Sequence, residues 1–165
     1  MKEKRFARIA RLTGRSQDKA LFKTHFQKLT KKQRKFFWAI FIHCWASSKA
    51  LIDKQSFFNL WCELNYLCHE LDESFPDPYD DREAIRSYCH AHPYYFIGIL
   101  TPKMIANLFA EYCHSESLDF LTTLAQKLHE EDLKSAYAYA NEALGLDENI
   151  DESIVEIKEH VESFL

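Results

Sequence analysis

Glycine and proline are scarce in this chain of 165 residues, which contains three glycines and four prolines. Because β-sandwiches and barrels need frequent turns, so low a content of turn-forming residues argues against both folds. It also argues against the glycine-rich loops that hold the phosphates of nucleotides. Hydrophobic residues nevertheless make up 47% of the chain and aromatic residues 15%. This composition excludes a disordered protein and predicts one folded domain.

Long apolar segments are also missing, and the cysteines cannot all be paired. The longest apolar run covers residues 36–46, whereas a membrane-spanning helix needs about 20 apolar residues. The basic start over residues 1–11 is not followed by the apolar stretch of a secretory signal. The five cysteines are an odd number, and several fall within apolar patterns, as reduced buried thiols do. We therefore expect no transmembrane segment and a cytoplasmic protein, because thiols stay reduced there.

The short motifs of common catalytic sites are absent. The sequence contains no G-x-S-x-G, P-loop, G-x-G-x-x-G or H-E-x-x-H pattern. We therefore expect no cofactor and favour a protein that is not an enzyme. A Cys–His dyad that forms only in three dimensions would leave no such signature, so the enzymatic class stays open.

Charge is distributed very unevenly along the chain. The formal net charge is −4, but residues 1–35, the basic segment, hold 13 of the 21 basic residues and only two of the 25 acidic residues. The remaining chain therefore carries a large negative excess. A basic segment on an acidic body predicts an anionic partner. The alternative is that the basic segment docks on the acidic face of its own chain or of a second copy.

Apolar residues recur with helical spacing through most of the chain, which predicts an all-α fold. We expect a single domain over residues 1–165, an orthogonal or irregular bundle of seven to eight helices in which two lobes are possible. Its predicted parts are basic N-terminal helices over 1–35, core helices over 36–71, an acidic loop over 72–81 and acidic C-terminal helices over 82–165. The run over 36–46 is apolar on every side, as is typical of a central helix. Residues 92–100 fit either a short buried helix or an extended segment.

Capping residues mark several helix ends. Thr30 and Gln33 form a capping box ahead of the central apolar run. Thr101 followed by Pro102 is a strong helix start. Further ends are predicted at Asp53 and Asp151, as N-caps, and at Gly145, as a C-terminal stop.

The same spacing predicts which residues face inward. The helix that ends near Leu29 is expected to bury Leu21 together with Phe22 and Phe26. The helix that follows Asp53 is expected to keep its apolar face as far as Leu71.

The basic segment carries the principal functional prediction, which is binding of a polyanion. Lys4, Arg8 and Arg11 lie on one side of a predicted helix, and residues 30–35 place cations at the start of another, where helix N–H groups favour a phosphate. Spaced cations neutralise phosphates, so nucleic acid is the favoured partner of a small regulatory or accessory protein. A membrane surface is a further possibility. The predicted polyanion-binding residues are Lys4, Arg8, Arg11, Arg15, Lys31, Lys32, Arg34 and Lys35.

Four adjacent Cys–His pairs, one of them His43-Cys44, suggest a metal-binding protein as a third alternative. The candidate ligands are Cys89, His90, His92, Cys113 and His114. However, the C-x₂₋₄-C spacing of structural zinc sites is absent, and neighbours on a helix point about 100° apart. We therefore predict no metal site, with cysteines packed inward and histidines at the boundary of the core.

The acidic C-terminal half is the basis of the second alternative, a protein-interaction module that self-associates or binds another protein. Within it, residues 118–148 resemble one degenerate tetratricopeptide repeat, with Phe120, Ala136 and Leu146 at the aromatic, small and apolar positions of that family. Leu124 and Glu148 depart from the pattern, and no second copy follows, whereas solenoids need about three repeats. The segment is therefore predicted to be an ordinary helical hairpin.

Overall fold

The computed structural model describes residues 17–47, 52–75, 77, 83, 87 and 91–163. Every regular element in these residues is a helix, which confirms the predicted all-α class. The elements are a helix over residues 17–27, α2 (Lys31–Ser47), α3 (Lys54–Leu71), α5 (Tyr95–Ile99), α6 (Pro102–Tyr112), α7 (Ser115–Glu130), α8 (Leu133–Leu144) and α9 (Ile150–Glu162). None of the described helices is long and apolar enough to cross a membrane.

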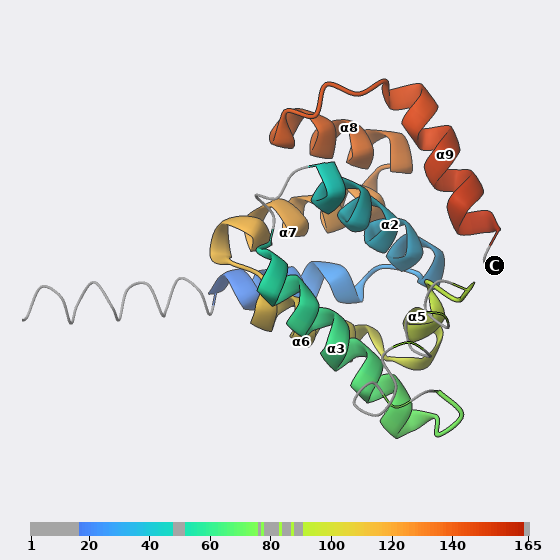
Figure 1. Cartoon of the computed structure of the whole chain (residues 1–165). Coiled ribbons are helices and arrows are strands. Elements are labelled where there is room, and N and C mark those ends of the chain that lie inside the picture. Colours follow the sequence, from blue (N-terminus) through green and yellow to red (C-terminus); the bar gives the residue numbers. More distant parts are fainter. Residues whose placement is uncertain are drawn as a thin grey trace, which may run out of the picture.

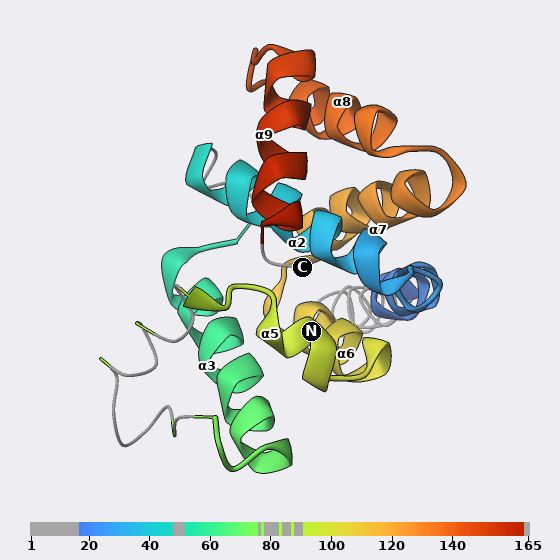
Figure 2. The ribbon, with the colours of Figure 1, turned by 90° about the vertical axis from the view of Figure 1, so that its right-hand side faces the viewer.

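Helix α2 occupies the centre of the bundle. It contacts α5, α7, α8 and α9, and Figures 1 and 2 show it between α8 and α9 on one side and α3 and α6 on the other. Phe37, Ile40, Phe41 and Cys44 are all buried. A helix that packs against neighbours on every side needs apolar residues on every side, which confirms the prediction for the run over 36–46.

A cluster of aromatic rings joins α2 to the helices around it. The ring of Phe109 in α6 lies 5.5 Å from that of Phe37 and 5.2 Å from that of Phe41, both nearly perpendicular. The same ring lies 6.0 Å from Phe26 of the helix over residues 17–27. Edge-to-face pairs at these distances add to the stabilisation from apolar burial, so the first described helix is part of the core.

The capping box at the start of α2 forms as predicted. The backbone N–H of Gln33 donates to Oγ1 of Thr30 at 3.2 Å, and the N–H of Thr30 donates to Oε1 of Gln33 at 2.8 Å. The side-chain amide of Gln33 also donates to the carbonyl of Leu128 at 3.0 Å. The start of α2 is therefore held against the end of α7.

The other predicted helix ends are confirmed, with one exception. Asp53 and Thr101 are N-caps, and Gly145 ends α8 with a φ of 62°. Asp151 is not an N-cap: the side chain of Asn149 caps α9 by accepting a hydrogen bond from the N–H of Glu152 at 3.1 Å. Asp151 lies in the first turn, where a carboxylate is also favoured by the helix dipole. An aspartate is favoured both as an N-cap and in the first turn of a helix, so the predicted N-cap of α9 was wrong by two residues.

Two residues predicted to face inward are exposed. Leu21 is 51% exposed because the buried face of its helix is centred on Phe22 and Phe26. Leu71 is 55% exposed because it ends α3, and Figure 1 shows this end projecting beyond α5 and α6. Helical spacing identifies a face but not how far the neighbouring helices extend along it.

The ambiguous segment over 92–100 forms the short helix α5, with Phe96 and Ile97 buried, which confirms the helical alternative. In the predicted acidic loop, the described residues 72–75 and 77 are not helical. The predicted helix at the N-terminus and most of the one over 82–91 lie outside the described residues.

Candidate anion-binding groove

A groove of about 570 Å³ lies where the start of α2 meets α5 and the end of α9. Its lining includes Lys31, Lys35, His92, Tyr94, Tyr95 and Ser163. In Figure 1, α9 runs back across the bundle and ends near the start of α2 and near α5. Three segments that are distant in the sequence therefore surround one recess, which we call the α2 groove.

Two lysines occupy the α2 side of this groove. Lys31 and Lys35 are four residues apart on α2, so they lie on one face of the helix, one above the other. The side chain of Lys31 crosses α5, with Nζ 3.7 Å from the point where a Cβ on Gly98 would lie. Lys35 lines the groove but is only 9% exposed. Neither lysine forms an ion pair or a side-chain hydrogen bond within the described part of the chain.

The electrostatics of this arrangement are unfavourable in the absence of an anion. Burial lowers the pKa of Lys35 from its usual value of 10.5, and the nearby charge of Lys31 lowers it further. An ammonium that has lost part of its hydration and has no counter-charge is less favourable than one in water, and a second cation beside it adds to this effect. A bound anion would remove both penalties, and the positive end of the α2 dipole would assist it.

The remaining residues of the predicted basic cluster do not line the groove. Lys32 is exposed, with Nζ 5.9 Å from the centre of the Phe36 ring. Arg34 is half-buried, and its Nε is buried with no hydrogen-bond partner among the described residues. Burial lowers the pKa of this guanidinium. Lys4, Arg8, Arg11 and Arg15 lie outside the described residues.

Few charges of the described part of the basic segment are paired with the acidic part of the chain. Lys19 forms one ion pair with Glu111, at 3.4 Å. The other basic residues within 17–35 form none in the part of the chain that the structure describes: Lys23, Lys28, Lys31, Lys32, Arg34 and Lys35. Over these residues, intramolecular neutralisation therefore accounts for only one of the seven positive charges.

The candidate metal ligands do not form a site within the described residues. Cys113 is buried at the end of α6, whereas His114 is exposed with Nε2 3.3 Å from Oδ2 of Asp53. His92 lines the α2 groove. Among the described residues, no three His, Cys, Asp or Glu side chains are arranged to hold a metal ion. Cys89 and His90 lie outside them.

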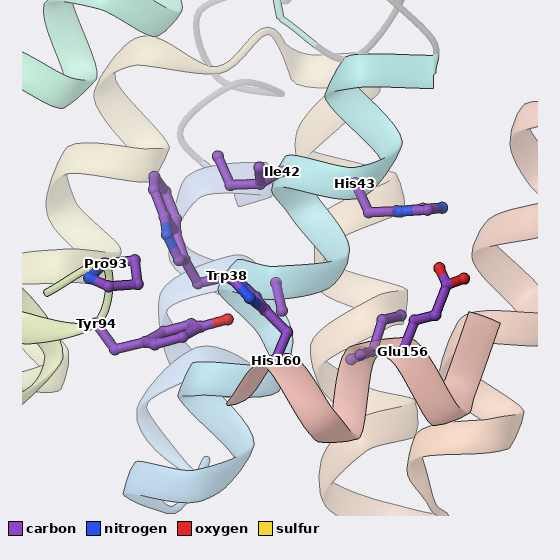
Figure 3. Close-up of a pocket in the computed structure, with 9 residues that line it drawn as sticks. Trp38, Ile42, His43, Pro93, Tyr94, Glu156 and His160 are labelled. Carbon is purple, nitrogen blue, oxygen red and sulfur yellow. The ribbon is translucent and has the colours of Figure 1, made fainter. Parts of the chain in front are cut away.

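A second cavity, of about 400 Å³, lies between α2, α9 and the turn before α5. Figure 3 shows Pro93 and Tyr94 at one end and His43 and Glu156 at the other, with Trp38 between them. Most of this lining is apolar, and the carboxylate of Glu156 would repel an anion. The α2 groove is therefore the better of the two sites for a negatively charged ligand.

The sequence did not predict this second cavity, because its lining comes from three segments with no common motif. One signal was present in the sequence: Glu156 and His160 are four residues apart, which places both on the same face of α9. His43 at its edge joins a polar network, with Nε2 2.7 Å from Oε2 of Glu148 and 3.1 Å from the hydroxyl of Tyr137. Nε2 of His43, Oε2 of Glu148 and the hydroxyl of Tyr137 all contact one another, so the network is better suited to holding helices together than to catalysis.

Comparison of the chain with family models, curated proteins and solved structures found no match.

Proposed function

We propose that this protein binds a polyanion, with nucleic acid as the favoured partner, through the surface of its basic segment, and that its role is regulatory or accessory. The observation that supports this most directly is the lack of carboxylate partners for six of the seven described cations over residues 17–35. Cations that their own chain does not neutralise are available for phosphates. The sequence adds Lys4, Arg8, Arg11 and Arg15 to the same segment.

The test is a salt titration of binding to duplex and single-stranded nucleic acid. Log affinity should fall linearly with log salt concentration, by about 0.9 per duplex phosphate neutralised. Reversing two exposed lysines together, Lys28→Glu and Lys32→Glu, should weaken binding and reduce that slope by about two phosphates. Circular dichroism should stay unchanged, because both side chains are exposed.

The matched control is the double variant Lys103→Glu and Lys158→Glu, which makes the same charge change at exposed positions of α6 and α9. This variant should bind with a nearly unchanged slope. Equal loss of affinity in the control would indicate a general effect of net charge, with no defined binding surface. No binding of the wild type to either form of nucleic acid at low salt would exclude the nucleic-acid proposal.

One observation favours a second candidate function, a protein-interaction module. Helix α9 exposes five acidic residues together with the 54% exposed side chain of Val155. The acidic residues are Asp151, Glu152, Glu156, Glu159 and Glu162. Under this alternative, a Val155→Glu variant loses self-association or partner binding, as measured by light scattering or pull-down, whereas binding to nucleic acid is absent in both proteins.

A further inference from the structure

We infer that the α2 groove is a discrete site for a terminal phosphate monoester, carried by a nucleic-acid strand end or by a free nucleotide. Lys31 and Lys35 form one wall of the site, with His92, Tyr94 and Ser163 around them. It is distinct from the open basic surface proposed above, because Lys28 and Lys32 do not line it.

The burial of Lys35 is the observation that points to a ligand. The residue as a whole is only 9% exposed, it lines the groove, and it has no ion-pair or hydrogen-bond partner among the described residues, although its Nζ is not fully buried. Its stem is packed within the protein while its ammonium keeps access to solvent, as is usual for long amphipathic side chains. The fold therefore holds an unpaired positive charge at this groove, beside that of Lys31.

Charge and access favour a terminal phosphate over an internal one. An internal phosphodiester brings one negative charge, whereas a terminal monoester brings between 1.5 and 2 at neutral pH, about the value that two ammonium groups balance. A recessed ammonium is also reached more easily by a group at the end of a chain than by one within a duplex backbone. The positive end of the α2 dipole adds to the attraction.

The groove has room for more than the phosphate. Its volume of about 570 Å³ falls within the usual range for small-molecule sites, roughly 300–1,000 Å³. Tyr94, Tyr95 and Ile99 give it apolar and aromatic walls beside the lysines. A sugar and base attached to the phosphate could therefore lie against these walls, which is why a nucleotide fits better than inorganic phosphate.

This inference relies on the proposed function only for the source of the phosphate, and the experiment separates the two. A single-stranded oligonucleotide with an internal fluorophore is prepared with a 5′-phosphate, with a 3′-phosphate, or with hydroxyl groups at both ends. Binding is measured by fluorescence anisotropy at one fixed salt concentration. A nucleoside 5′-monophosphate, measured by calorimetry, tests the free nucleotide.

The wild type should bind one of the phosphorylated oligonucleotides about tenfold or more tightly than the hydroxyl form, because the added contacts are charge-assisted hydrogen bonds. In Lys35→Met this preference should disappear, while binding to the hydroxyl form should weaken no more than it does in Lys28→Met. Lys28→Met is the control, and it should weaken all three oligonucleotides equally.

A second variant tests the groove without altering Lys35. Gly98→Asp places a carboxylate beside Nζ of Lys31, since a Cβ at this position would lie 3.7 Å from that atom. It should abolish the preference for a terminal phosphate by occupying the place of the anion, whereas Gly98→Ala should retain it. If Lys35→Met does not fold, as judged by circular dichroism, this pair decides the question.

Each result leads to a definite conclusion. Equal affinity for phosphorylated and hydroxyl ends, with no binding of the nucleotide, overturns the groove inference and leaves polyanion binding intact. Binding of the nucleotide that depends on Lys35, with no binding of any oligonucleotide, supports the groove and overturns the proposed nucleic-acid function. A preference for terminal phosphate that persists in both Lys35→Met and Gly98→Asp overturns the location of the site.

Discussion

The phenol of Tyr137, in α8, donates a hydrogen bond to the carboxylate of Glu148, in the connection between α8 and α9. The same carboxylate oxygen accepts a hydrogen bond from the hydroxyl of Ser153 at 3.3 Å and lies 2.7 Å from Nε2 of His43. His43 belongs to α2, Tyr137 to α8 and Ser153 to α9, whereas Glu148 lies in the loop between α8 and α9. One carboxylate therefore links the two C-terminal helices to the central helix α2. The hydrogen bond from Tyr137, followed by that of His43, holds the pKa of Glu148 below its usual value of 4.5.

Removing the carboxylate should destabilise the fold more than removing the phenol hydroxyl. Glu148→Ala leaves the fully buried Tyr137 hydroxyl without its carboxylate acceptor, and we expect a loss of about 2 kcal/mol in the free energy of unfolding. Tyr137→Phe removes the donor and leaves Glu148 with His43 and Ser153, so about 1 kcal/mol is expected. Urea unfolding measures both, with the exposed Glu142→Ala as the control. Equal stability of Glu148→Ala and this control would contradict the role of the Glu148 carboxylate in linking α8 and α9 to α2.

The same network should weaken at low pH. Because the pKa of Glu148 is lower in the folded state than the usual 4.5, its contribution is fully present above that usual value and is lost as the pH falls through the folded value. The difference in free energy of unfolding between the wild type and Glu148→Gln should therefore be constant near neutral pH and shrink below about pH 4.5. Urea unfolding of both proteins over a range of pH measures it. A difference that grows on acidification would show that the sign is wrong.

The helix ends were predicted well because their signals are local. The reciprocal hydrogen bonds of Thr30 and Gln33 involve residues three apart, so the sequence contains both partners. Side-chain burial near helix ends was predicted less well. Leu21 and Leu71 have the right spacing, but their exposure depends on where the neighbouring helices end.

The candidate site was predicted only in part, for the same reason. The sequence singled out Lys31 and Lys35 as anion-binding residues, but not the burial that separates Lys35 from the exposed Lys32. The groove that Lys35 lines is completed by residues within 91–99 and by Ser163, which are far away in the sequence. The spacing of residues in the sequence shows that basic side chains cluster at the start of α2. Which of them line a groove and which lie on the open surface depends on tertiary packing.

The capping box offers a test of how much a local signal contributes. Thr30→Ala removes the oxygen that accepts from the Gln33 N–H, and loss of such a cap reduces stability by about 1 kcal/mol. Thr24→Ala is a matched control, because Thr24 is an exposed helix residue whose hydroxyl bonds to the carbonyl of Ala20 within its own helix. It should be neutral or slightly stabilising, since alanine is the better helix former. Thermal unfolding of the two variants compares them directly, and equal losses would show that the cap contributes nothing specific.

Replacing Lys35 by methionine should stabilise the ligand-free protein. Methionine retains most of the buried side-chain stem and removes an ammonium that has no partner in the described residues and lies near Lys31. Removing an unpaired and partly desolvated charge should be stabilising, and a gain of at most about 1 kcal/mol raises Tm by at most about 2–4 °C in a domain of this size. Lys28→Met, at an exposed position, should change the free energy of unfolding by less than about 0.5 kcal/mol.

The pH dependence of this gain identifies its cause. Because the pKa of Lys35 is lower in the folded state than the usual 10.5, the unfolded chain binds more protons between the two values, and the wild type gains stability as the pH rises through that window. The advantage of Lys35→Met should therefore be largest near neutral pH and shrink under alkaline conditions, as measured by urea unfolding. A methionine variant less stable than the wild type at neutral pH would show instead that the ammonium of Lys35 contributes to folding. A constant advantage at all pH values would assign the gain to packing, because the relief of an unpaired charge must disappear once the lysine loses its proton.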